Sequence, residues 1–127
     1  MNILLLEPNA ILGRTYRQFL RNNNHEVLWV QDAQAAISAI DQRVPDLILL
    51  ELQLALHNGI EFLYELRSYA EWQGLNVVVL SHIPEKAWLK EILKERLGVK
   101  RYLYKSHTNL ANLTIAINQV TKISEIA

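Results

Sequence analysis

Five short apolar runs alternate with five segments of helical periodicity along this 127-residue chain. The runs occupy residues 2–6, 26–30, 46–50, 75–80 and 101–104. Runs of this length, rich in Leu, Ile and Val, are typical of strands covered on both faces, as in a parallel sheet. Right-handed crossovers between such strands place helices on both faces of the sheet. The pattern therefore predicts a single α/β domain over residues 1–127, a doubly wound five-stranded parallel sheet whose tail at 124–127 we expect to fray.

Candidate capping residues stand in front of the predicted helices. They have side-chain oxygens that can accept a hydrogen bond from the first helical turn. These residues are Asn9, Asp32, Asn58, and either Thr108 or Asn109. Pro84 is predicted to lie in the first turn of the fourth helix, and Gly98 to follow its last turn.

Composition restricts the classes of function. The chain carries 13 Lys and Arg against 13 Asp and Glu, so it lacks the overall positive charge that nucleic acid or an anionic membrane attracts. It has no cysteine, which excludes disulfides, thiolate metal sites and a cysteine nucleophile. No stretch approaches the length of a membrane span, and the N-terminus lacks the signature of a secretory signal. We therefore expect a cytoplasmic protein that binds neither nucleic acid nor membranes directly.

Four polar residues stand where predicted strands end. Glu7, Glu51, Ser81 and Lys105 follow the first, third, fourth and fifth strands. The carboxyl ends of parallel strands form one edge of the sheet, which is where open α/β sheets place their sites. We expect two carboxylates, one hydroxyl and one ammonium to converge there.

This constellation, with the segments ILLLEPN, PDLILLELQL and the following Gly59, VVVLS and YLYK, resembles the receiver domain of two-component response regulators, over about residues 2–120. The resemblance implies a CheY-like (βα)5 fold, also called flavodoxin-like, with strand order 2-1-3-4-5. The family transfers a phosphoryl group from a phosphohistidine to an Asp at the end of the third strand, using Mg²⁺. It thus implies a signalling module in a phosphorelay and not an enzyme.

The resemblance also assigns a role to each pocket residue. Glu7 matches the first of the family's paired acidic residues, and Glu51 stands at the phosphoacceptor position. Ser81 matches the switch hydroxyl that hydrogen-bonds the phosphoryl group. Lys105 matches the family's lysine, and Tyr102 matches its switch aromatic residue.

Four positions depart from the family's pattern. Pro8 and Glu51 each stand where an Asp is usual, and Ala55 and Ser106 replace prolines. Mg²⁺ demands a near-octahedral set of oxygens, and Pro8 offers no side-chain oxygen. Glu51 is one methylene longer than Asp, and a misplacement of about 1 Å can slow a reaction about 100-fold. We therefore expect a degenerate phosphoacceptor site without Mg²⁺. At Lys105–Ser106 we expect a trans peptide bond, because a cis bond not followed by proline costs about 2.5–4 kcal/mol.

The longer side chain of Glu51 can reach Lys105. Because an unpaired buried lysine is costly, we predict an ion pair between the two. Our hypothesis is that this pair locks the domain in one conformation, with an active-like one as one option. The alternative is a functional, Mg²⁺-dependent phosphoacceptor in a phosphorelay, with the metal held by Glu7 and Glu51.

The resemblance implies a signalling partner, either a kinase or an output protein. The family binds partners, and forms dimers, through the face made by the fourth helix, fifth strand and fifth helix, so a homodimer through this face is an option. Trp88, Tyr102 and Tyr104 are candidate anchors there, since aromatic residues are common at interface hot spots. Alternatively, Trp88 is part of the core and the tyrosines are ordinary strand residues.

Two other interpretations stay open. A flavodoxin-like enzyme or cofactor binder would need a phosphate-binding loop, and the four glycines are too far apart to form one. His57, His82 and His107 follow the third, fourth and fifth strands and could form a three-histidine metal site. Solvated loop histidines are the default for all three.

Overall fold

The computed structural model describes residues 1–54 and 58–126, with side chains through residue 120. Within these residues, five parallel strands form one sheet in the order β2-β1-β3-β4-β5. The strands are β1 (Asn2–Leu6), β2 (Glu26–Val30), β3 (Leu47–Leu50), β4 (Asn76–Ser81) and β5 (Arg101–Tyr104). The predicted α/β class and strand order are confirmed, and β5 is an edge strand, as its mixed composition indicated.

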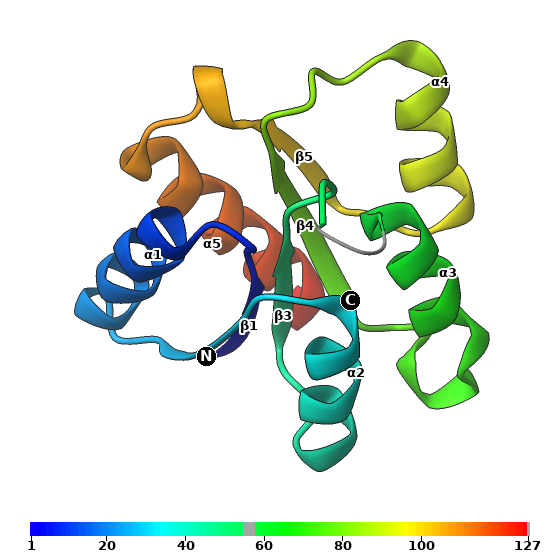
Figure 1. The fold of residues 1–127 in the computed structure, drawn as a ribbon, viewed down its shortest axis with the longest axis horizontal. Coiled ribbons are helices and arrows are strands. Elements are labelled where there is room, and N and C mark those ends of the chain that lie inside the picture. The colour runs from blue at the N-terminus through cyan, green and yellow to red at the C-terminus, as the bar shows by residue number, and fades with distance from the viewer. Residues whose placement is uncertain (55–57, 127) are drawn as a thin grey trace.

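The described part of the chain also forms five α-helices. They are α1 (Ala10–Asn22), α2 (Ala33–Gln42), α3 (Gly59–Ser68), α4 (Ala87–Lys90) and α5 (Leu110–Ile126). Two short 3-10 helices, η1 (Ala70–Trp72) and η3 (Lys105–His107), and a π-helix, η2 (Glu91–Arg96), which continues α4, complete the list. Figure 1 shows α1 and α5 on one face of the sheet and α2, α3 and α4 on the other. No helix among the described residues has the length and apolarity to cross a membrane.

The core lies in two layers, one on each face of the sheet. Side chains alternate along a strand, so in β1 Leu4 and Leu6 join the layer under α2, α3 and α4, while Ile3 and Leu5 join the layer under α1 and α5. All four residues of β3 are buried, so this strand has no solvated face. A polar residue directly after β3 is therefore held at the edge of the core.

The predicted caps of four helices are confirmed. The side-chain oxygens of Asn9, Asp32 and Asn58 accept hydrogen bonds from backbone N–H groups three residues later, at 2.8–2.9 Å. For α5 the cap is Asn109, whose Oδ1 accepts from the backbone N–H of Asn112 at 2.7 Å. This helix extends through Ile126, into the tail for which we expected fraying.

The start of α4 was predicted wrongly. The helix begins at Ala87 and not near Pro84; Lys86 before it is extended, and other contacts hold the preceding residues. The backbone N–H of Ile83 donates to Ser81 Oγ at 3.1 Å, and the carbonyl of Ile83 accepts a hydrogen bond from the Tyr102 hydroxyl. At the other end, Gly98 has a φ of 65°, the left-handed conformation expected after a helix.

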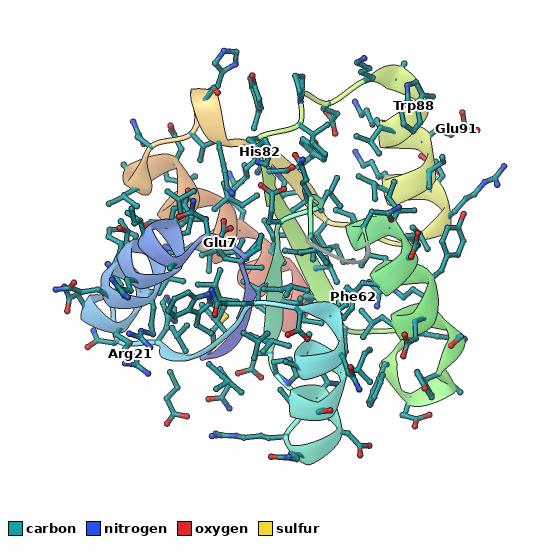
Figure 2. All side chains as sticks on the ribbon, in the orientation of Figure 1. Glu7, Arg21, Phe62, His82, Trp88 and Glu91 are labelled. Atoms are coloured by element: carbon teal, nitrogen blue, oxygen red, sulfur yellow. The ribbon has the colours of Figure 1, made fainter. Side chains whose placement is uncertain are left out.

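Trp88 does not join the core. Trp88 is 59% exposed on α4, whereas Leu89 is buried. Figure 2 shows Trp88 at the upper end of α4, near Glu91. Partial core burial, one of the two roles considered for Trp88, is therefore wrong.

Candidate functional site

The four predicted pocket residues meet at the carboxyl ends of β1, β3, β4 and β5. Glu7, Glu51 and Ser81 are buried, each with at most 2% of its surface exposed. The side chain of Lys105 is 10% exposed. Figure 2 shows Glu7 and His82, which follow β1 and β4, at this end of the sheet. The predicted convergence is confirmed.

The sheet itself sets the positions of the two acids. The backbone N–H of Glu7 donates to Val30 O, and that of Glu51 donates to Leu6 O, both at 3.0 Å. These bonds extend the pairing of β1 with β2 and β3 by one residue beyond the strands. The backbone of both acidic residues is therefore held in place by the same pairing that holds the strands.

Lys105 bridges the two acids. Its Nζ lies 2.6 Å from Glu7 Oε1 and 2.7 Å from Glu51 Oε1. The predicted Glu51–Lys105 ion pair is confirmed, and Glu7 joins it. Burial lowers the pKa of Lys105, but hydrogen bonds and attraction from both carboxylates outweigh it, so the pKa lies above its ordinary value.

Both oxygens of Glu51 are fully engaged. Oε2 accepts from the Ser81 hydroxyl and from the backbone N–H of Gln53 at 3.1 Å. Oε1 accepts from Lys105 and from the backbone N–H of His82 at 3.2 Å, and it lies 2.6 Å from His82 Nδ1. A carboxylate offers about four lone-pair sites, and four donors contact this one, with the His82 ring beside them. Burial raises the pKa of Glu51, but the bonds from Lys105, Ser81 and Gln53 outweigh it, and the pKa lies below its ordinary value.

Sequence reasoning missed two members of this cluster. His82 was treated as a solvated loop residue, yet its Nδ1 contacts Glu51 and its Nε2 contacts the side chain of Gln53. The signal was their position: His82 directly follows Ser81, and Gln53 lies two residues after Glu51. His107, by contrast, packs edge-on against the Tyr104 ring, with centroids 4.9 Å apart.

The suggested three-histidine metal site includes His57, so it falls partly outside the described residues. No group of three His, Asp or Glu side chains within the described residues is placed to hold a metal ion. His57 and Ala55 lie outside the described part of the chain.

The loop that carries Glu7 is held by β2. The Trp29 indole N–H donates to Glu7 O at 2.9 Å, and Gln31 Nε2 donates to Pro8 O at 3.1 Å. The indole lies so close to Gly13 of α1 that a Cβ there would overlap it. Sequence patterns do not indicate this contact, because it joins Trp29 of β2 to α1 and to the loop after β1.

Hydrogen bonds also connect Tyr102 to the pocket. The Tyr102 hydroxyl donates to Ile83 O, the backbone N–H of Ile83 donates to Ser81 Oγ, and Ser81 donates to Glu51. Burial raises the pKa of Tyr102. The Lys105–Ser106 bond that follows β5 is trans, as predicted.

Comparison with known proteins decides the family. The response regulator receiver domain family matches residues 3–118. The chain belongs to this family. Relatives of this receiver domain include the KDP operon transcriptional regulatory protein KdpE of Escherichia coli K12, which is 33% identical over 86 residues. That match covers 68% of this chain and 37% of KdpE.

A second relative is the response regulator protein PmrA of Pseudomonas aeruginosa, which is 38% identical over 80 residues. This match covers 63% of the chain and 34% of PmrA, so the receiver domain spans only about a third of the length of these two relatives. Among solved structures, the BeF3-activated N-terminal receiver domain of RstA from Klebsiella pneumoniae has a similar fold. It aligns with a TM-score of 0.82 at 24% identity and covers 95% of this chain and 98% of its own.

Proposed function

We propose that this receiver domain signals without phosphorylation, because the carboxylate of Glu51 permanently occupies the donors that a phosphoryl group would need. Support comes from the engagement of Glu51 by Lys105 and Ser81, the lysine and switch hydroxyl of the pocket. The extra methylene of Glu relative to Asp brings the carboxylate to these donors. In this proposal, the amino-acid sequence alone favours one conformation of the domain. That conformation is the active-like one.

The chemistry of phosphoryl transfer supports the same conclusion. An acceptor oxygen must approach the phosphorus in line with a free lone pair, and positioning dominates the rate. In this proposal Glu51 has no free lone pair for this attack, since four donors and the His82 ring already contact its two oxygens. Its lowered pKa also makes it a poorer nucleophile. The module therefore acts through binding and not through catalysis.

The donor set does not suit Mg²⁺. Pro8 supplies no side-chain oxygen where the family's second acid would stand. The ammonium of Lys105 contacts both Glu7 Oε1 and Glu51 Oε1, occupies the space between them and neutralises one of their two negative charges. We infer that the pocket is stabilised by this internal cation and does not recruit a divalent one.

The partner is proposed to be a kinase or an output protein that docks on α4, β5 and α5. Trp88 offers a large exposed aromatic surface on α4. Tyr102 is half-buried and connects this face to Ser81. Tyr104, two residues later on β5, lies next to His107.

Intact-mass measurement after incubation with acetyl phosphate and Mg²⁺ tests the proposal. We expect no adduct on the wild-type chain. The double variant Glu51→Asp/Pro8→Asp, which restores both usual acids, should gain about 80 Da in a base-labile form. A stoichiometric, base-labile adduct on Glu51 of the wild type would overturn the proposal in favour of a working phosphoacceptor.

A further inference from the structure

One side of α1 carries an arginine row, made by Arg14, Arg17 and Arg21. These residues are spaced by three and four positions, so their side chains lie along the same side of the helix. Residues 8–25 contain these three arginines and no Asp or Glu. Ile11, three residues before Arg14, is 73% exposed, the highest value among the large apolar residues described. This side of α1 therefore combines positive charge with one exposed apolar side chain.

The charge of the arginine row is not neutralised from within the described chain, where none of its members forms an ion pair. The Arg17 guanidinium lies 5.2 Å from the centre of the Trp29 ring, and Arg21 Nη2 donates to Val27 O at 3.2 Å. These contacts hold two of the side chains beside β2 without compensating their charge. An anionic surface placed against α1 would supply that compensation.

A groove of the opposite charge lies between α2 and α3. Its volume is about 560 Å³. Ala33, Ile37 and Phe62 supply its apolar lining, and the charged side chains that line it are two acids, Glu61 and Glu65. The two acids are exposed and stand four residues apart, so they lie on the same side of α3. The groove thus offers two negative charges beside an apolar surface.

The helices that form the groove carry little positive charge. Together α2 and α3 contain three acids and one cation, Arg67. Arg67 is directed at three backbone carbonyls, to which it donates hydrogen bonds of 2.9–3.0 Å. Arg43, which follows α2, is paired with Glu26 at 3.1 Å. The groove therefore keeps a net negative charge.

We propose that the arginine row docks into the α2–α3 groove of a second copy of this chain. Arg14 and Arg21 would meet Glu61 and Glu65, and Ile11 would pack on the apolar lining. A second copy is the occupant that the charges favour, because both members of the complementary pair belong to the same chain. The formal net charge of the chain is zero, so copies approach each other without overall repulsion.

The contact is head-to-tail, because α1 and the α2–α3 groove lie on opposite faces of the sheet (Figure 1). One copy contributes α1 and its neighbour contributes α2 and α3. Contacts of this type continue into open rows of copies, or into rings where the rotation between copies closes. The inference goes beyond the proposed function, since neither surface includes a pocket residue or the face made by α4, β5 and α5.

Sedimentation velocity of the full chain over a series of concentrations tests the proposal. The row variant is Arg14→Gln/Arg21→Gln, and the groove variant is Glu61→Gln/Glu65→Gln. An equimolar mixture of the two variants is the decisive sample. In it, the arginine row of the groove variant and the groove of the row variant are both intact, so a single contact is available.

Two control variants change the net charge by the same amount at exposed residues outside both surfaces. Lys86→Gln/Arg96→Gln matches the row variant, and Glu91→Gln/Glu95→Gln matches the groove variant. Thermal unfolding of every variant checks that the fold is retained. The controls separate the effect of the two surfaces from that of net charge alone.

We expect the wild type to form species larger than a dimer as its concentration rises, and to return to the monomer as salt is added. The row and groove variants should each associate about fivefold more weakly, since each exposed charge pair contributes modestly. The controls should stay within about twofold of wild type. The mixture should form a 1:1 pair with the affinity of wild type and grow no further.

Four results would overturn the proposal. The first two are a wild type that stays monomeric and one that stops at a symmetric dimer. The third is equal weakening by a variant and its control, and the fourth is a mixture that forms no pair. None of these results depends on whether Glu51 accepts a phosphoryl group, so this proposal and the proposed function can fail separately.

Discussion

Lys105 is the residue on which the charge balance of the pocket depends. Its ammonium is the partner of two carboxylates that are each 2% exposed. Replacing it by Met should lower the free energy of unfolding at neutral pH by about 3–5 kcal/mol, because buried charges lose their cation. Urea unfolding measures this difference. Lys90→Met is the control: it removes an exposed, unpaired lysine and should change stability by no more than about 0.5 kcal/mol. Equal effects of the two substitutions would contradict the account.

The pH dependence of stability follows from the pKa shifts in the same pair. A carboxyl group whose pKa is lowered by folding contributes stability above its unfolded value, and this is lost as the pH falls through the folded value. The stability advantage of wild type over Glu51→Gln should therefore be constant at neutral pH and shrink below pH 4.5, the ordinary value for Glu. Urea unfolding across the acid range tests this. A difference that stays constant there would show that Glu51 is not stabilised in its charged form.

Folding raises the pKa of Lys105, and this shift sets the alkaline limit of the stabilisation. A lysine whose pKa is raised by folding contributes stability that is complete below its unfolded value, 10.5, and is lost as the pH rises through the folded value. The pair thus stabilises the fold over the whole range between these limits.

At the scale of residues, the sequence predicted the locations of those side chains that the backbone holds in place. Glu7, Glu51, Ser81 and Lys105 converge because each is fixed by the end of a strand. His82 and Gln53 were missed because their contacts depend on how loop side chains turn, which no periodicity encodes. The contacts that His82 and Gln53 make with Glu51 could therefore not be predicted from sequence patterns.

At the scale of elements, α1 and β2 meet through a single tight contact. The Trp29 indole packs on Gly13 and holds the carbonyl of Glu7. Gly13→Ala should lower stability by about 1–3 kcal/mol through overpacking, even though Ala favours helix by about 1 kcal/mol. Gly74→Ala is the matched control, because a Cβ there meets nothing within 4 Å. Thermal unfolding compares them, and a stabilised Gly13→Ala variant would show that the indole moves freely.

The helices show which signals in a sequence are local. α1, α2, α3 and α5 begin at residues that carry their own cap, so their starts were predicted. α4 has no side-chain cap, and tertiary bonds from Tyr102 and Ser81 set where it starts. Its π-helical continuation ends where Arg67 Nε donates to Leu97 O at 2.9 Å, a contact 30 residues away in sequence. The start of α4 has no local signature, whereas Gly98 marked the end of its continuation in the sequence.

At the scale of the whole molecule, the alternation of apolar runs with helical segments was enough to predict the parallel sheet and its two helical layers. The order of the strands came from the family resemblance, since alternation alone allows several orders. The balanced charge of the whole chain conceals a local excess, since residues 82–104 contain six Lys and Arg against three Glu.

The central claim is that the protein's own donors and cation permanently engage the Glu51 carboxylate. The most direct test is to follow the side-chain carboxyl ¹³C resonances of Glu7 and Glu51 by NMR during a Mg²⁺ titration. The Glu51→Asp/Pro8→Asp variant serves as the positive control. We predict that the wild-type resonances stay in place while those of the variant shift to saturation. A saturable shift of both wild-type carboxylates would contradict the account.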